Sequence, residues 1–254
     1  MESGLDGAAF ARDGFGIIRN AVPAPLVLAL RDAVQRVQDT VRELPAELRD
    51  RLTFERDLPA SRRNGIAAPE VGDAIFILGD PVTFDALFWE VLRQPAIISA
   101  AHIALGVQDL AAHFMNVTIK HPRFGRAIGW HRDYPNGYAC PASSCFVRAM
   151  LCLDGMSDAG GVTTFIPGSH RLDDDEVSRH SPPKGWQPPE DETVTVCCEP
   201  GDLVLIHPKV LHGGGMNTSP SPRRNIVVQI GNAAAPLRSV PDQEAVVGYR
   251  LNTL

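Results

Sequence analysis

The sequence lacks several features that would place the protein in well-defined classes. Its 254 residues hold no run of about 18 apolar residues, the length that a membrane-spanning helix requires. The opening stretch MESGLDGAAF has neither a basic nor an apolar segment, so we expect no secretory signal. Lysine and arginine (24) are outnumbered by aspartate and glutamate (30), which gives no overall attraction to nucleic acid. We therefore expect a cytoplasmic protein that binds neither membranes nor nucleic acid.

Cysteine is scarce and aromatic residues make up only 6% of the chain. None of the five cysteines stands in a CxxC pair, so we expect them to be reduced and to pack as small core residues. The hydrophobic fraction of 44% and the charged fraction of 21% exclude a disordered chain, a coiled coil and a collagen. The length is typical of one domain, which we expect to cover residues 1–254. We expect the protein to be a monomer or a homodimer.

Residues 1–107 are expected to be mainly helical. Apolar residues at steps of three and four predict an amphipathic helix over residues 25–44, and further helices are expected at 82–92 and 95–105. An arginine-rich loop at 49–63 lies between the first two helices, and it is either a solvated surface or a flap over a site for an anion. The apolar stripe of the first helix is Val27, Leu30, Val34, Val37 and Val41.

Strands separated by turns are expected from residue 108 to about 235. Segments 111–120, 145–153, 161–166, 193–198, 203–207 and 225–231 are rich in β-branched or aromatic residues and are bounded by glycine and proline. This pattern indicates a sandwich or a jelly roll rather than βαβ units. The segment 171–193 holds four prolines and is interpreted as a long loop. We expect this loop and the loop at 49–63 to close over the site.

Three side chains form a candidate metal site. In an extended chain His131 and Asp133 point the same way because they are two residues apart. A second histidine, either His207 or His212, can come from a distant strand. Two histidines and one carboxylate with open positions form the facial triad of non-haem Fe(II) oxygenases. A zinc enzyme and a non-catalytic metal-binding jelly roll are the alternatives.

Arg223 is the candidate anion-binding residue. It lies eleven residues after His212, at the start of the strand 225–231. The planar guanidinium of an arginine binds a carboxylate with two parallel hydrogen bonds. Its neighbour Arg224 shares a face with aliphatic residues and is expected to point away from the pocket, toward the helices.

Taken together, the motifs resemble the phytanoyl-CoA dioxygenase family of Fe(II)/2-oxoglutarate-dependent oxygenases. The segments that carry the resemblance are the N-terminal stretch 10–20, Trp130-His131-x-Asp133, the turn at 166–170, and 201–223 with its spaced histidine and arginine. The resemblance implies a mainly β fold. Its core is a double-stranded β-helix (jelly roll, cupin-like) with the N-terminal helices packed on it.

The resemblance also implies residue roles. His131, Asp133 and His212 would bind Fe(II), and Arg223 would bind the distal carboxylate of the co-substrate 2-oxoglutarate. The enzyme would use O₂ to hydroxylate a small molecule (a secondary metabolite, an amino-acid derivative or an acyl compound) and release succinate and CO₂. Family halogenases have Ala or Gly in place of Asp133, so the aspartate favours hydroxylation, and the substrate is not inherited from the resemblance.

Strand parity adds two candidates for binding the co-substrate. Arg148 lies between apolar residues of the strand 145–153, and a buried arginine needs an anionic partner. It either binds 2-oxoglutarate or substrate inside the barrel, or pairs with a helix carboxylate outside. Thr118 shares a face with Asn116 and Lys120 on the strand before the metal motif and is expected to touch the co-substrate.

Overall fold

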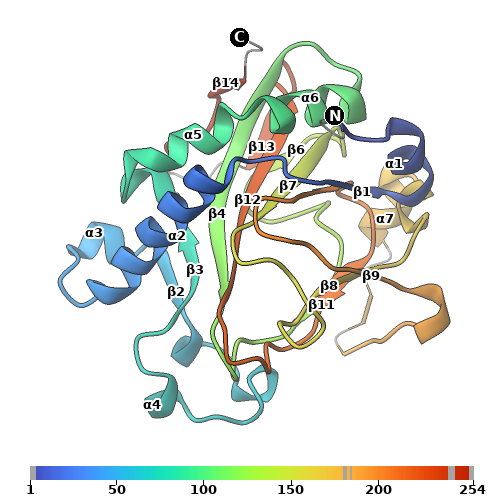
Figure 1. The fold of residues 1–254 in the computed structure, drawn as a ribbon. Coiled ribbons are helices and arrows are strands. Elements are labelled where there is room, and N and C mark those ends of the chain that lie inside the picture. The colour runs from blue at the N-terminus through green and yellow to red at the C-terminus, as the bar shows by residue number, and fades with distance from the viewer. Residues whose placement is uncertain (1–3, 180–181, 184, 240–243, 252–254) are drawn as a thin grey trace.

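The computed structural model describes residues 4–179, 182–183, 185–239 and 244–251, and its strands are built into antiparallel sheets (Figure 1). The larger sheet has the order β1 (Phe15–Ile18), β10 (Leu203–Ile206), β7 (Phe146–Cys152), β12 (Arg223–Asn232), β4 (Leu110–Lys120), β3 (Ile75–Gly79) and β2 (Leu52–Phe54), with β14 (Arg250–Leu251) beside β4. The smaller sheet has the order β5 (Ile128–His131), β11 (His212–Gly214), β8 (Thr163–Phe165) and β9 (Val194–Val196). A separate pair joins β13 (Leu237–Ser239) to β6 (Cys140–Pro141).

The two faces of the larger sheet have different neighbours. On β7, Val147, Ala149 and Leu151 belong to the large hydrophobic cluster that includes the N-terminal helices. Met150 and Cys152 point the other way and join Phe165 and Val196 of the smaller sheet in a second cluster. One face is therefore covered by helices and the other encloses the barrel, which confirms the jelly-roll core with helices packed on it.

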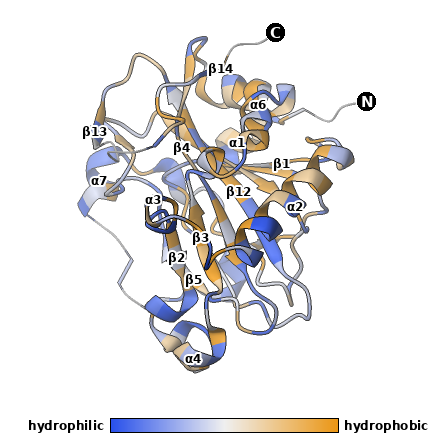
Figure 2. Ribbon diagram, turned by 90° about the vertical axis from the view of Figure 1, so that its left-hand side faces the viewer, coloured by the Kyte–Doolittle hydropathy of each residue, from blue (hydrophilic) through white to orange (hydrophobic). Residues whose placement is uncertain are grey.

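The helices that cover the larger sheet come mainly from the first hundred residues. Four residues of the predicted apolar stripe, Val27, Leu30, Val34 and Val37, are buried on α2 (Ala24–Asp39), where each fully buried Val or Leu contributes about 1.5–3 kcal/mol. The helix ends at Asp39 rather than at residue 44, and Val41 is buried just beyond it. The predicted helix 95–105 is α6 (Pro95–Leu105), which contacts β7 and β12. Figure 2 shows hydrophobic residues in the central strands, whereas the peripheral helix α7 (Asp174–Arg179) is mainly hydrophilic. The short helix α4 (Ala68–Val71) carries residues of both kinds. No helix of the described residues is long and apolar enough to cross a membrane.

The N-terminal part is less helical than expected, because it also supplies β1, β2 and β3 to the larger sheet. Phe15 of β1 stacks on Phe165 with 4.3 Å between ring centroids, which ties this strand to the barrel interior. The predicted helix 82–92 is three short pieces, since Pro81 and Asp85 start separate turns. The pieces are η3 (Pro81–Thr83), η4 (Ala86–Phe88) and α5 (Trp89–Leu92); the other N-terminal helices are α1 (Gly7–Asp13), α3 (Ala46–Arg49), η1 (Glu55–Asp57) and η2 (Ala60–Arg62).

The segment expected to be one long loop, 171–193, contains α7 (Asp174–Arg179) and η6 (Glu190–Glu192), and follows η5 (Ser169–Arg171). Asp173 and Glu176 explain the helix. The backbone N–H of Glu176 donates to Asp173 Oδ1 (2.7 Å), and the N–H of Asp173 donates to Glu176 Oε2 (3.1 Å). This is a reciprocal capping box, and the DDDE motif was its sequence signal. Residues 180–181 and 184 of the segment lie outside the described residues.

Candidate metal centre

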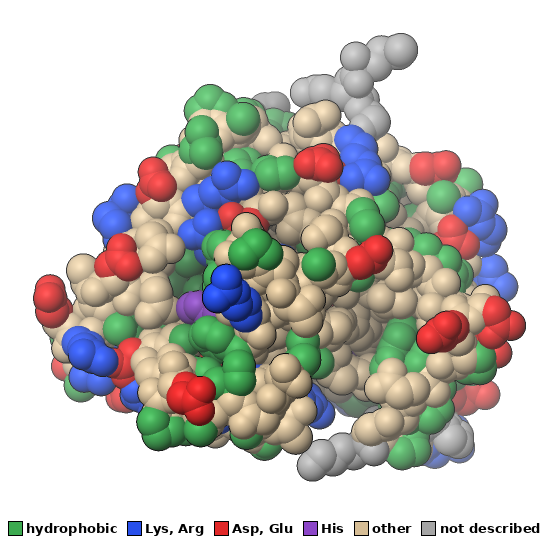
Figure 3. Space-filling view, turned by 60° about the horizontal axis from the view of Figure 1, so that its bottom comes forward, with side chains coloured by type: hydrophobic (Ala, Val, Ile, Leu, Met, Phe, Trp, Pro, Cys, Tyr) green, Lys and Arg blue, Asp and Glu red, His purple; other side chains and the backbone are tan. Residues whose placement is uncertain are grey.

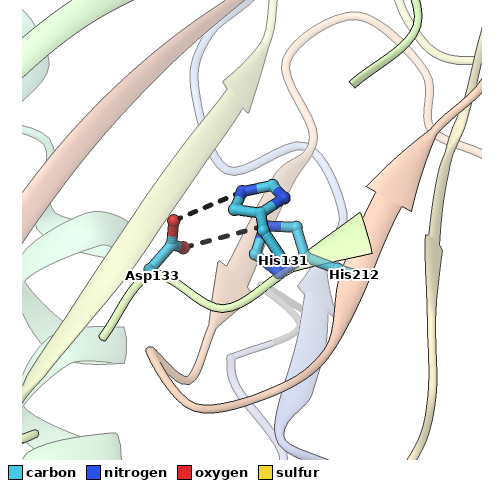
Figure 4. A group of neighbouring side chains, drawn as sticks. All are labelled: His131, Asp133 and His212. Atoms are coloured by element: carbon cyan, nitrogen blue, oxygen red, sulfur yellow. Dashed lines mark ion pairs between the residues drawn. The ribbon is translucent and has the colours of Figure 1, made fainter. Parts of the chain in front are cut away.

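His131, Asp133 and His212 meet inside the barrel (Figure 4). Their candidate ligand atoms all lie within 4.8 Å of one another. The two histidines meet because β5 and β11 are antiparallel neighbours in which His131 is directly opposite His212. Nε2 of His131 lies 3.6 Å from Asp133 Oδ1, and Nε2 of His212 lies 3.7 Å from Asp133 Oδ2. Three ligand atoms therefore face one common point.

Both histidines are held in the tautomer that a metal requires. Nδ1 of His131 bonds to the carbonyl of Gly129 (2.9 Å), and Nδ1 of His212 bonds to the carbonyl of Val210 (3.1 Å). A carbonyl only accepts hydrogen bonds, so each Nδ1 carries the hydrogen and each Nε2 offers a lone pair to the centre. Oδ2 of Asp133 is buried and has no hydrogen-bond partner. An orphaned carboxylate oxygen beside two free nitrogens fits a divalent metal ion.

The surroundings favour the ligating forms of Asp133 and His212, whereas the nearby Asp133 raises the pKa of His131 against the effect of burial. Burial by itself would raise the pKa of Asp133, but the charge of Arg148 and the nearby His212 and His131 hold it below its ordinary value. Burial, assisted by His131, lowers the pKa of His212 to about 4. At neutral pH Asp133 is therefore ionised and His212 is neutral, as metal binding requires.

A small cavity of about 100 Å³ adjoins the triad, and Arg223 lies in its wall. Arg223 is 4% exposed, and its Nη2 donates to Thr163 Oγ1 at 2.9 Å. Its Nε is buried without a partner, and burial lowers its pKa to about 10. Arg224 points to the opposite face and forms two hydrogen bonds of 2.7 Å with Asp154. The strand register expected for the two arginines is the observed one.

Thr118 and Arg148 also line this cavity. Arg148 is not on the outer face paired with a helix carboxylate. Its Nη1 lies 3.2 Å from Oδ1 of Asp133, and its guanidinium lies over the rings of Phe114 and Tyr138. Its closest anionic partner among the described residues is thus a member of the triad.

Lys120, which shares a strand face with Thr118, is also fully buried in the cavity wall. Its Nζ donates to the carbonyls of Gly161 and Gly215. Burial, with the charge of Arg223, lowers its pKa to about 6. Sequence reasoning gave no role to Thr163 or Asn225, which line the same wall. Strand parity was the available signal for Asn225, which is two residues after Arg223.

The other conspicuous histidines and arginines mostly have structural contacts. His207 packs against His170 with 4.8 Å between ring centroids, away from the triad. In the arginine-rich loop, Arg51 pairs with Asp80, and Arg63 is buried against backbone carbonyls. Arg62 is the member of this loop that lines a cavity next to the triad.

Comparison with known proteins links this geometry to one family. The family model described as "Phytanoyl-CoA dioxygenase (PhyH)" matches residues 10–225. A dioxygenase of Aspergillus aculeatus, aneA, is 35% identical over 51% of this chain and 43% of its own length. A probable alpha-ketoglutarate-dependent hypophosphite dioxygenase of Stutzerimonas stutzeri is 29% identical over 60% of this chain and 54% of its own length. The matched segments thus span about half of each relative.

The fold is shared with solved structures. The epimerase SnoN of nogalamycin biosynthesis, crystallised with Fe³⁺, alpha-ketoglutarate and nogalamycin RO, superposes with a TM-score of 0.69. The superposition covers 98% of this chain and 93% of SnoN at 19% sequence identity. At that identity the likeness concerns the barrel and the arrangement of its strands.

Proposed function

The chain belongs to the phytanoyl-CoA dioxygenase family, and from this premise we propose that it is an Fe(II)- and 2-oxoglutarate-dependent dioxygenase that hydroxylates a small molecule. The observation that carries the proposal is the pairing of two features in one cavity. The triad His131, Asp133 and His212 presents three ligand atoms to one point. Arg223 lines the same cavity with an unpaired Nε.

In this proposal His131, Asp133 and His212 would hold Fe(II). The bound metal would supply the activation of O₂, which couples the oxidation of 2-oxoglutarate to succinate and CO₂ with insertion of one oxygen atom into a substrate C–H bond. The products are succinate, CO₂ and the alcohol, so both atoms of O₂ are accounted for.

The protein side chains orient the reactants. Arg223 binds the distal carboxylate of 2-oxoglutarate through a charge-assisted pair that Thr163 holds in place. Thr118 lies on β4, opposite Asn225 of β12, and contacts the co-substrate from that strand. Arg148 orients Asp133 and lies where a bound anion can also reach it. The enclosing sheets bury Asp133 and His212 and so shield these two ligands from water.

The test is the formation of succinate from 2-oxoglutarate by the purified protein, measured with and without Fe(II) and ascorbate. Amino acids, acyl thioesters and natural-product scaffolds are supplied as candidate substrates. We expect succinate that depends on Fe(II) and increases with the right substrate. A zinc hydrolase or a non-catalytic metal-binding protein would form no succinate under any of these conditions, and that result would overturn the proposal.

A further inference from the structure

A second, larger cavity adjoins the metal centre. It has a volume of about 510 Å³, in the usual range for small-molecule sites of about 300–1,000 Å³. Thr118, Ile128 and Arg148 line both this cavity and the small one beside the triad. Figure 3 shows the lower face of the molecule, where a histidine is visible in a recess between hydrophobic and basic side chains. We call the larger space the outer cavity.

The charged lining of the outer cavity is entirely basic. Arg62, Arg126 and Arg148 line it, and no aspartate or glutamate of the described residues does. No carboxylate of the described chain forms an ion pair with the guanidinium of Arg62 or of Arg126. Glu55 accepts a hydrogen bond from the backbone N–H of Arg126 (3.2 Å) rather than from its side chain.

Arg126 and Arg62 differ in how they are held. Arg126 is 4% exposed; its Nη2 donates to the carbonyl of Pro59 (3.2 Å), and its guanidinium lies 5.3 Å from the ring centroid of Phe76. Its position is therefore fixed before any ligand binds. Arg62 is exposed, and its side chain forms no hydrogen bond with the described residues. One arginine is preorganised in the wall and the other is free to bind a ligand near the surface.

The charges of the two cavities do not balance. Four arginines line them together, namely Arg62, Arg126, Arg148 and Arg223, against the single lining carboxylate of Asp133. Lys120 is left out of this balance, because burial lowers its pKa to about 6. A divalent metal and the dianion 2-oxoglutarate cancel each other, so loading the centre leaves the positive surplus in place. A buried positive charge without a partner is costly, so the surplus favours an anion as the remaining ligand.

The remaining lining of the outer cavity is apolar enough to bind the hydrophobic part of an organic molecule. Leu58, Phe76 and Ile77 line the outer cavity beside the arginines. An inorganic anion would leave these surfaces exposed to water. A ligand with an apolar portion would bury them and place its charged end against the arginines.

We propose that the outer cavity binds the substrate and that Arg126 and Arg62 bind an anionic group of it, a carboxylate or a phosphate attached to an apolar body. This inference rests on the proposed function, because it takes the triad as the place of reaction. The anionic group fixes the distance at which the apolar part reaches the triad. Arg126 and Arg62 therefore determine which C–H bond is presented.

The experiment measures binding rather than turnover. Protein loaded with Zn(II), which binds two histidines and a carboxylate without redox chemistry, is saturated with 2-oxoglutarate so that Arg223 is occupied. Naphthalene-2-carboxylate, phenyl phosphate and the neutral naphthalene-2-carboxamide are titrated by calorimetry. We expect at least one of the two anions to bind about tenfold or more tightly than the amide, since a charge-assisted hydrogen bond is roughly twice as strong as a neutral one.

The variants separate the two arginines from general charge effects. We expect Arg62→Gln and Arg126→Gln to weaken anion binding about tenfold each and to leave binding of the amide unchanged. Arg126→Lys, which keeps the charge, should restore part of the affinity. The control is Arg123→Gln, which removes the same charge from an exposed position that lines neither cavity. Arg62→Gln keeps the test decisive if Arg126→Gln perturbs folding, because Arg62 is exposed.

The inference and the proposed function fail in different ways. Equal binding of the anions and the amide, no binding of either anion, or equal losses in Arg62→Gln and Arg123→Gln would overturn the inference. Fe(II)-dependent formation of succinate by the wild-type protein would still support the proposed function in that case. Absence of that succinate, with normal anion binding at Arg62 and Arg126, would instead overturn the function and leave an anion site standing.

Discussion

Arg148 and Asp133 form an ion pair inside the barrel, with Nη1 of the arginine 3.2 Å from Oδ1 of the aspartate. Asp133 is also one of the three triad residues, and its other oxygen, Oδ2, is the orphan and lies 3.7 Å from Nε2 of His212. The carboxylate is therefore shared: one oxygen is held by Arg148 and the other is left for a metal. Such partners orient a ligand before the metal binds.

We expect Arg148→Met to lower metal affinity by about 10–100-fold, the usual effect of removing a group that orients a ligand. The physical reason is that Asp133 would lose its fixed orientation and its pKa would rise. Arg148→Lys should fall between the wild type and Arg148→Met. Calorimetric titration with Zn(II) measures the affinity, and equal or tighter binding by Arg148→Met would show that the arginine competes with the metal instead.

Metal binding should depend on both histidines of the triad. His131→Ala and His212→Ala should each reduce metal affinity by more than about 100-fold, since even orienting partners are worth about 10–100-fold. The fold should survive because the barrel is held by apolar clusters on both faces of the larger sheet. Metal content after dialysis and circular dichroism are the measurements. His102→Ala, on α6, serves as the control and should keep its metal.

Residue spacing alone could find only part of this site, and the choice of His212 came from the family resemblance. The spacing of His131 and Asp133 places them on one side of an extended segment, and parity separates Arg223 from Arg224. The choice between His207 and His212 depends on the pairing of β5 with β11, which aligns His212 with His131. Local periodicity carries no information about such pairing between distant strands. His207 instead accepts a hydrogen bond at Nδ1 from the backbone N–H of Lys209 (3.1 Å).

The fold class was predictable from the long strands, whereas the short ones were not. β4 and β12 extend over ten or more residues with a clear pattern. β2 has three residues, too few to show an alternation, and its place is set by pairing with β3. The outer cavity was equally hidden, because Arg62 and Arg126 are brought together only by tertiary packing. The hydrogen bond from the N–H of Ala127 to the carbonyl of Arg62 (2.9 Å) joins the two segments.

Replacing Arg223 should change the binding of 2-oxoglutarate, whereas replacing Arg224 should change the stability of the fold. Arg223→Ala should raise the Michaelis constant for 2-oxoglutarate strongly, because losing one partner of a desolvated charge pair costs about 2–5 kcal/mol. Arg224→Ala should leave that constant nearly unchanged and lower the melting temperature, since Arg224 binds Asp154 through two hydrogen bonds. Succinate formation at varied 2-oxoglutarate and thermal unfolding are measured side by side. A larger kinetic effect from Arg224→Ala would reverse the assignment.

The segments 49–63 and 185–193 should become more protected from hydrogen exchange when the metal and 2-oxoglutarate bind. Both segments contact β5, the strand that carries His131. Trp130 Nε1 of β5 donates to Gln187 Oε1 of the second segment (3.0 Å), and Gly129 of β5 lies close to the Arg62 side chain of the first. Loops beside a rigid barrel commonly close over its ligands. Exchange measured by mass spectrometry on the free and the loaded protein provides the check. Strong protection in the free protein that does not change would count against closure.

Stability should fall in mild acid, and His207 should be one cause. Burial lowers the pKa of His207 from 6.5 to about 3. Because its pKa is lower in the folded state, the unfolded chain binds more protons between these two values, and the free energy of unfolding decreases as the pH falls through that window. Above about pH 6.5 this contribution is fully present, and one such group changes the free energy of unfolding by at most about 1.4 kcal/mol per pH unit.

The variant His207→Asn tests this prediction, because asparagine keeps an acceptor for the N–H of Lys209 and cannot be protonated. We therefore expect the variant to lose less free energy of unfolding than the wild type between about pH 6.5 and pH 5, measured by urea unfolding at each pH. An equal loss in both proteins would assign the acid sensitivity to other buried histidines such as His113, whose pKa burial lowers to about 4.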